Sequence, residues 1–177
     1  MKALLVAGLG FGDEGKGGIV DELCRRYSAD LVVRYNGGAQ AAHHAIDATG
    51  RVHCFSQFGA GHFAGAKTYL SQYMMIEPLG LQNEAAALKK LTNQDPFQKL
   101  YIHERAPIIT PYHRALGQVR EEARLQKHGS CGMGIGELGA DLADECEWRV
   151  LYAVECLKRV SLSVHVLKQI RAQKLAK

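Results

Sequence analysis

A glycine-rich segment near the start of the chain has the residue types and spacing of a phosphate-binding loop. Residues 10–17 read GFGDEGKG, which follows the pattern GxxxxGK. Backbone N–H groups at a helix start favour anions, and Lys16 can reach a phosphate oxygen. Gly17 stands where such loops usually carry a serine or threonine that ligates Mg²⁺. We therefore expect Asp13 to supply the metal ligand, because Mg²⁺ prefers oxygen donors.

The spacing alone leaves two interpretations of this segment open. One is a phosphate-binding loop in which the Asp13 carboxylate also serves as a base. The other is a generic glycine-rich turn that leaves Asp13 and Glu14 in solvent. A phosphate-binding loop needs a strand before it and a helix after it, and the neighbouring sequence predicts both.

The order of the predicted elements indicates an α/β fold. Ala3–Ala7 reads as a short buried strand, Ile19–Tyr27 as a helix and Leu31–Arg34 as a second buried strand. This order is typical of a mostly parallel sheet with flanking helices. We expect one domain over residues 1–177. The other expected elements are strands at Val52–Phe58 and Lys99–His103, helices at Glu77–Leu91, at His113–Gln126 and from Ala140 onward, and loops at 36–44 and 129–136.

Composition narrows the class of protein and its partners. The net charge is +4, which is too small to indicate nucleic-acid binding, and no basic run with interleaved aromatics occurs. The chain has five cysteines and no CxxC pair, which indicates reduced thiols rather than a disulfide framework. No apolar run reaches the length of a membrane span. We expect a cytoplasmic protein without membrane or nucleic-acid partners.

Four segments, in order along the chain, resemble the adenylosuccinate synthetase family. The most specific is FGDEGKGGIVD at 11–21, which resembles the family signature WGDEGKGKIVD. VVRYNGGAQAAHHA at 32–45 resembles VVRxxGGxNAGHT, and IITPYHRALGQVREEA at 108–123 resembles ILPYHxxLDxxxE. HGSCGMGIGE at 128–137 stands where the family has IGTTGRGIGP. Together these segments outweigh the interpretation as a generic turn.

The resemblance implies a purine nucleotide ligase that joins aspartate to IMP through a 6-phosphoryl intermediate and splits GTP. It makes Asp13 the base that removes the N1 proton of the purine, and a contact of Mg²⁺. It implies that His43 donates a hydrogen bond to a GTP phosphate oxygen and that the Ala42 carbonyl is a ligand of the metal. The residues expected to bind the nucleotides are Gly12, Glu14, Gly15, Lys16, Gly17, Gln40, Ser130 and Cys131.

Departures from the family pattern leave the purine substrate open. Gln40 replaces an asparagine, Cys131 a threonine and Met133 an arginine around the expected IMP phosphate. A branch of the family acts on dGMP and tends to carry serine in place of the loop aspartate, so Asp13 favours IMP. Between the second and third of these segments, Ser56, Gln57 and His62 are as compatible with a core or turn role as with a site.

The family chain is far longer, which makes the expected fold incomplete. Neither a guanine-reading TKxD motif nor an arginine-rich aspartate loop occurs here. We therefore expect a fragment, a natural truncation or one piece of an assembly, inactive or dependent on the missing part. A truncated sheet exposes an edge and apolar surface, which predicts a homo-oligomer. The main alternative is a non-catalytic nucleotide-binding module; a P-loop kinase or GTPase fits less well, because of Gly17 and the missing guanine motif.

Overall fold

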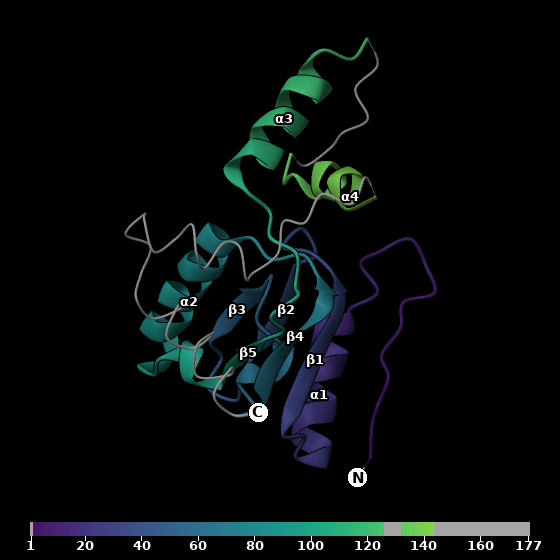
Figure 1. Cartoon of the computed structure of the whole chain (residues 1–177). Helices are drawn as coiled ribbons and strands as arrows, with labels where there is room; N and C mark the ends of the chain where they lie inside the picture. Colours follow the sequence, from purple (N-terminus) through teal and green to yellow (C-terminus); the bar gives the residue numbers. More distant parts are fainter. Residues whose placement is uncertain (1, 126–131, 144–177) are drawn as a thin grey trace.

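A three-stranded parallel sheet forms the centre of the computed structural model, which describes residues 2–125 and 132–143 (Figure 1). Strands β1 (Leu31–Gly37), β4 (Lys67–Met74) and β5 (Leu100–Ile102) lie in the order β1-β4-β5. Strands β2 (His43–Ile46) and β3 (Val52–Phe55) form a separate antiparallel pair. The predicted α/β class with a parallel sheet and flanking helices is confirmed.

Helices flank this sheet, and residues at the first turns of two of them explain where those helices begin. The Glu77 side chain accepts hydrogen bonds from two backbone N–H groups of the α2 start. Thr110 and His113 form a reciprocal capping pair at the α3 start. No helix within 2–125 or 132–143 is long and apolar enough to cross a membrane. The helices are α1 (Lys16–Tyr27), α2 (Pro78–Thr92), α3 (Pro111–Glu122) and α4 (Ile135–Ala143), with short 3₁₀ turns η1 (Ala60–His62) and η2 (Pro96–Lys99).

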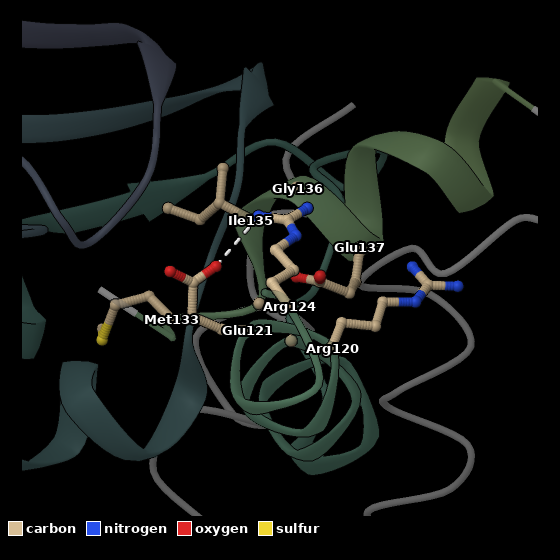
Figure 2. Close-up of a pocket in the computed structure, with 9 residues that line it drawn as sticks. Arg120, Glu121, Arg124, Met133, Ile135, Gly136 and Glu137 are labelled. Carbon is tan, nitrogen blue, oxygen red and sulfur yellow. Dashed lines mark hydrogen bonds and ion pairs between the residues drawn. The ribbon is translucent and has the colours of Figure 1, made fainter. Parts of the chain in front are cut away.

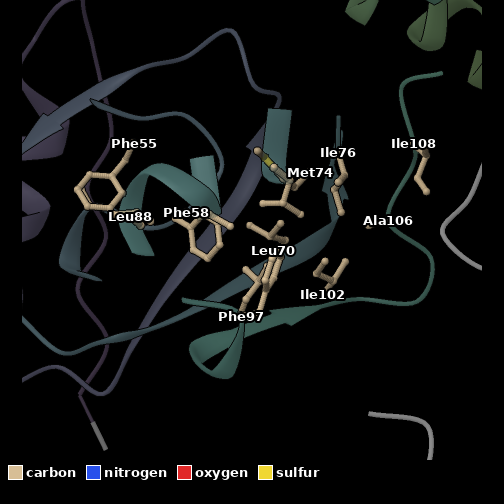
Figure 3. Close-up of a cluster of buried hydrophobic side chains, with 14 of the residues drawn as sticks. Phe55, Phe58, Leu70, Met74, Ile76, Leu88, Phe97, Ile102, Ala106 and Ile108 are labelled. Carbon is tan, nitrogen blue, oxygen red and sulfur yellow. The ribbon is translucent and has the colours of Figure 1, made fainter. Parts of the chain in front are cut away.

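The apolar core lies on one face of the sheet, between the strands and α2. Leu70 of β4 and Leu81 and Leu88 of α2 are almost completely buried there. Phe58 joins them from the segment before η1, as Figure 3 shows. Burying such side chains contributes roughly 1.5–3 kcal/mol each. The core therefore depends on residues distributed from β2 to the segment after β5.

The opposite face of the sheet lacks cover from the described elements. Along β1, exposed residues alternate with half-buried ones, so Leu31, Val33 and Tyr35 point away from the core. Tyr73 and Tyr101 continue this exposed surface on β4 and β5. Parallel sheets are normally covered on both faces. The prediction that Leu31–Arg34 forms a strand is confirmed, but the prediction that it is buried is wrong on this face.

The predicted first strand, Ala3–Ala7, is not a strand in the structure. The segment has no regular secondary structure and lies apart from the sheet (Figure 1). Leu5 and Leu9 are 94% and 99% exposed. A short apolar run becomes a strand only where a neighbouring strand accepts its hydrogen bonds. No described strand pairs with this segment, and the free edge of β1 is left unpaired within the described residues.

The remaining predicted elements agree with the structure to different degrees. The helices expected at Ile19–Tyr27, Glu77–Leu91 and His113–Gln126 correspond to α1, α2 and α3, and Lys99–His103 corresponds to β5. β3 ends at Phe55 rather than Phe58. The loop expected at 36–44 includes the start of β2, and β4 was not predicted. The helix expected from Ala140 onward is described only to Ala143, within α4.

A buried carboxylate holds the segment after β3 against α2. The two carboxylate oxygens of Glu84 accept hydrogen bonds from the backbone N–H groups of Ser56, Gln57 and Phe58, at 3.0, 2.7 and 3.2 Å. The Gln57 side chain in turn bonds the backbone N–H and C=O of Glu77. Ser56 and Gln57 therefore have a structural role here, one of the two alternatives left open by the sequence.

His62 is also a core residue, and its burial predicts a pH-dependent stability. Burial is the main cause that lowers the pKa of His62 to about 4, with Lys99 and His53 adding to it. In the unfolded chain a histidine has a pKa of about 6.5. Protonation below that value therefore favours unfolding, and the stability present above it is lost as the pH falls toward the folded pKa. We expect the free energy of unfolding to fall by roughly 2 kcal/mol between pH 7.5 and pH 5 because of this residue.

Urea unfolding of the wild type and of His62→Phe at both pH values measures this contribution. The variant should lose roughly 2 kcal/mol less than the wild type over that interval. His44→Asn, at an exposed position, is the matched control and should follow the wild type. An equal pH dependence in His62→Phe and the wild type would contradict the prediction.

Candidate functional site

The described parts of the three glycine-rich segments meet at one end of the sheet. Three residues join α1 to β1, so the two elements run in opposite directions and α1 begins near the end of β1. There, a Cβ placed on Gly17 would lie 2.5 Å from the Cβ of His43. A Cβ on Gly38 would lie 2.8 Å from Ile135, the first residue of α4. Ligand sites of open α/β folds form at this carboxyl end of the strands.

The first loop has a backbone that needs its glycines at two positions. Gly12 and Gly15 have φ angles of 111° and 71°, a region that favours glycine. Asp13 adopts a φ of 53°, which is uncommon for a residue with a side chain. Gly15 immediately precedes α1 and takes the N-cap position. The loop therefore turns sharply and presents the first N–H groups of α1 at its end.

Close packing explains why Gly17 departs from the usual serine or threonine. Besides the His43 Cβ, a Cβ at this position would lie 3.0 Å from the Cα of His43 and 3.1 Å from its carbonyl carbon. Backbone atoms cannot move aside as a flexible side chain can. A serine would therefore displace α1 from β2, and the side chain that would ligate the metal in other loops has no room here.

His43 is half-buried, and the charges of two cationic side chains act on it. Its burial, followed by the positive charges of Arg34 and Lys16, lowers the pKa of the imidazole below its usual value. The ring is therefore neutral at physiological pH and keeps one N–H group that can donate to an anion. The grouping of His43, Arg34 and Lys16 favours a negatively charged ligand.

Arg34 is a residue of this cluster that we did not select from the sequence. Its guanidinium donates a hydrogen bond to the Phe58 carbonyl at 3.3 Å. The negative charge of buried Glu84 stabilises the charged form of Arg34. The side chain thus connects the site to the buried network around Glu84. Its position in the VVRYNGG segment, just before the second glycine-rich loop, was the available signal.

The expected metal ligands are few but chemically suitable. The Asp13 carboxylate is exposed and makes no hydrogen bond or ion pair within the described part of the chain. No group of three or more His, Cys, Asp or Glu side chains capable of holding a metal occurs in 2–125 or 132–143. Mg²⁺ prefers oxygen donors, and the Asp13 carboxylate is the described side chain that we expected to supply one. The Ala42 carbonyl lies one residue before His43, which is compatible with this arrangement.

The other expected ligands divide into two groups. Gln40 is exposed, and its amide oxygen lies beside Gly38, next to the contact with α4. Ser130 and Cys131 lie outside the described residues.

His113 was not selected as a site residue from the sequence. Its Nε2 lies 2.9 Å from an Asp141 oxygen, and this contact connects α3 to α4. Because Nδ1 accepts from the Thr110 N–H, the hydrogen on Nε2 faces this carboxylate.

A pocket of about 240 Å³ lies between α3 and the start of α4 (Figure 2). Arg124 pairs with Glu121 at 2.9 Å, and Arg120 extends away from this pair. Glu137 also lines the pocket. The two arginines and two glutamates balance in charge, so the pocket does not by itself attract an anion. Met133 contributes an apolar wall where the family pattern has arginine.

Comparison with known proteins agrees with this arrangement of loops. A family model described as adenylosuccinate synthetase matches residues 5–175. The chain belongs to the adenylosuccinate synthetase family. An adenylosuccinate synthetase from Methanosarcina barkeri is 32% identical over 151 residues, which cover 85% of this chain and 35% of the relative. One from Chlorobium chlorochromatii is 38% identical over 136 residues, which cover 76% of this chain and 30% of the relative.

Two solved structures share the fold. The fully ligated adenylosuccinate synthetase from Plasmodium falciparum aligns with a TM-score of 0.69 at 22% identity, over 91% of this chain and 41% of that one. Succinoaminodeoxyadenylate synthetase of cyanophage S-2L, bound to dGMP and to dATP as an energy donor, aligns with a TM-score of 0.64 at 20% identity. That alignment covers 82% of this chain and 39% of the phage chain. This chain therefore spans about a third of the length of the curated synthetases that it matches.

Proposed function

We propose that the cluster at the carboxyl end of the sheet binds the phosphates of a purine nucleoside triphosphate, as part of an adenylosuccinate synthetase-type ligase. The observation that carries this proposal is the direct packing of Gly17 against His43. The start of α1 therefore lies against His43, whose imidazole is neutral, and both Lys16 and Arg34 add positive charge near it. Such a group of fixed donors and cations suits a polyphosphate.

The individual roles follow from chemistry and from the family pattern. Lys16 and the N–H groups of Gly15 and Gly17 bind phosphate oxygens, with Gly12, Glu14 and Gln40 around them. His43 donates its N–H to a phosphate oxygen and stabilises the charge that develops during transfer. Asp13 takes the N1 proton of IMP, so that the 6-oxygen becomes the nucleophile. Asp13 and the Ala42 carbonyl would hold Mg²⁺, which would neutralise part of the phosphate charge. Ser130 and Cys131 stay predictions for the IMP phosphate.

A turnover assay tests the ligase itself. The full chain is incubated with Mg²⁺, GTP, IMP and aspartate, and release of phosphate is followed with each substrate omitted in turn. A ligase splits GTP only when IMP and aspartate are both present, and Asp13→Asn should reduce that rate at least about a hundredfold. Repeating the assay with dGMP in place of IMP tests the other purine. GTP cleavage that persists unchanged in Asp13→Asn would contradict the assigned base.

A second candidate function is a nucleotide-binding module without catalysis. The observation that favours it is the cluster of Lys16, Arg34 and His43, which can bind a polyphosphate without any group that binds aspartate. Saturable binding of Mg-GTP without any release of phosphate would support the module over the ligase. Both candidates fit the single 1–177 domain and the cytoplasmic location that we predict from the sequence.

We also propose that the chain forms a homo-oligomer through the uncovered face of the sheet. That face has an exposed apolar surface formed by Val33, Tyr35 and Tyr73. The ring centroids of Tyr35 and Tyr73 lie 5.2 Å apart. Val33→Lys places a charge in this surface and should raise the dissociation constant at least about tenfold. Sedimentation velocity at micromolar concentration measures this dissociation constant. The control is Glu22→Lys, at an exposed position on α1. A monomeric wild type would contradict the proposal.

A further inference from the structure

The anion-binding groups of the first loop already have an anion in contact with them. One carboxylate oxygen of Glu14, Oε1, accepts a hydrogen bond from the Gly10 N–H at 3.0 Å. The other, Oε2, forms an ion pair with the Lys16 ammonium. The Glu14 carboxylate therefore bridges the N–H of one loop residue and the lysine that we assign to phosphate binding.

The loop is shaped around this carboxylate. A Cβ placed on Gly8 would lie 2.8 Å from both Glu14 oxygens and 2.6 Å from the Lys16 nitrogen. The ion pair thus lies directly against the backbone of Gly8, which has no side chain to separate them. A glutamate carboxylate is ionised throughout the physiological pH range.

A phosphate group and a carboxylate bind to the same kinds of partner, namely backbone N–H groups and a cation. Lys16 and the Gly10 N–H cannot serve both anions in full at the same time. We propose that Glu14 is an internal occupant of the phosphate position, which an incoming polyphosphate must displace from Lys16. This inference rests on the proposed function of the loop, and it assigns Glu14 a regulatory role at that site instead of a direct contact with phosphate.

Such an occupant makes the site selective for highly charged ligands. A polyphosphate carries several negative charges and can replace the single charge of Glu14 on Lys16, whereas a weakly charged anion gains little by the exchange. Removal of the Glu14 charge should therefore strengthen the binding of a simple polyphosphate. It also removes the repulsion between two anions in one loop, which acts in the same direction.

Isothermal titration of the full chain with inorganic pyrophosphate, without metal, tests the proposal and avoids any role of Glu14 near Mg²⁺. Glu14→Gln keeps the size of the side chain and should bind pyrophosphate about three- to tenfold more tightly than the wild type. Glu22→Gln removes one negative charge from an exposed position on α1 and should change the affinity less than about twofold. Unchanged or weaker binding by Glu14→Gln would overturn the proposal.

Lys16→Met separates this inference from the function on which it rests. If Lys16→Met loses pyrophosphate binding while Glu14→Gln shows no gain, the loop binds phosphate but Glu14 does not occupy it. If Lys16→Met binds as tightly as the wild type, the phosphate site is elsewhere and both proposals fail. The Gly10 amide resonance in a ¹⁵N-labelled chain provides a second readout. It should shift when pyrophosphate is added to the wild type, and Glu14→Gln should already show a displaced Gly10 resonance without ligand.

Discussion

Replacing Gly17 with alanine should destabilise the chain by about 2 kcal/mol and weaken Mg-GTP binding at least about tenfold. Alanine is intrinsically a better helix former than glycine by about 1 kcal/mol, so the sign of the effect depends on packing. At Gly17 the new methyl group would meet the backbone of His43 at 3.0 Å, and α1 would have to move away from β2. The displacement separates Lys16 from His43, which lowers affinity as well as stability.

The neighbouring glycine provides a matched control for this substitution. A Cβ on Gly18 meets nothing within 4 Å, and its φ is not in the left-handed region. Gly18→Ala should therefore stabilise the chain by roughly 0.5–1 kcal/mol and leave nucleotide affinity unchanged. Urea unfolding and calorimetric titration of both variants measure the two effects. Equal changes in Gly17→Ala and Gly18→Ala would show that α1 does not pack on His43.

Replacing Glu84 with alanine should cost about 3 kcal/mol or more of unfolding free energy. The substitution leaves the N–H groups of Ser56, Gln57 and Phe58 without an acceptor in the interior, and each unsatisfied buried group costs about 1–3 kcal/mol. It also removes a negative charge that acts on the half-buried Arg34. We therefore expect a shift of Arg34 and a weaker site in addition to lower stability.

The control for this variant is Asn83→Ala, which lies one residue away on the exposed side of α2. It should change the unfolding free energy by less than about 0.5 kcal/mol. Chemical unfolding followed by circular dichroism measures both variants. A Glu84→Ala protein as stable as Asn83→Ala would show that water or other groups satisfy the 56–58 backbone.

The sequence predicted those parts of the site that depend on local chemistry. The first loop and α1 follow from glycine and lysine spacing between 10 and 17. His43 required the family resemblance, because a histidine pair has no specific pattern of its own. Gly17 was correctly seen as a departure, but its reason, the contact with His43 on another element, is visible only in the structure.

Long-range arrangements could not be predicted. β4 has buried and half-buried residues on both faces and a polar sequence, KTYLSQYM, so it lacks the alternation that indicates a strand. Glu84 lies 28 residues from Ser56, and no local pattern predicts that its side chain accepts from that backbone. Ala3–Ala7 was predicted as a strand from its apolar run, although a strand also requires pairing with a neighbouring strand, and the local sequence does not reveal whether that pairing forms.

The most direct test of the phosphate site is a titration of the ¹⁵N-labelled chain with Mg-GTP, followed by the amide resonances. We predict that resonances of Gly15, Lys16 and Gly17 shift together with that of His43, with one dissociation constant, and that Lys16→Met raises this constant at least about tenfold. Shifts confined to the pocket beside Arg120 and Arg124, with the first loop unaffected and Lys16→Met equal to the wild type, would contradict the account.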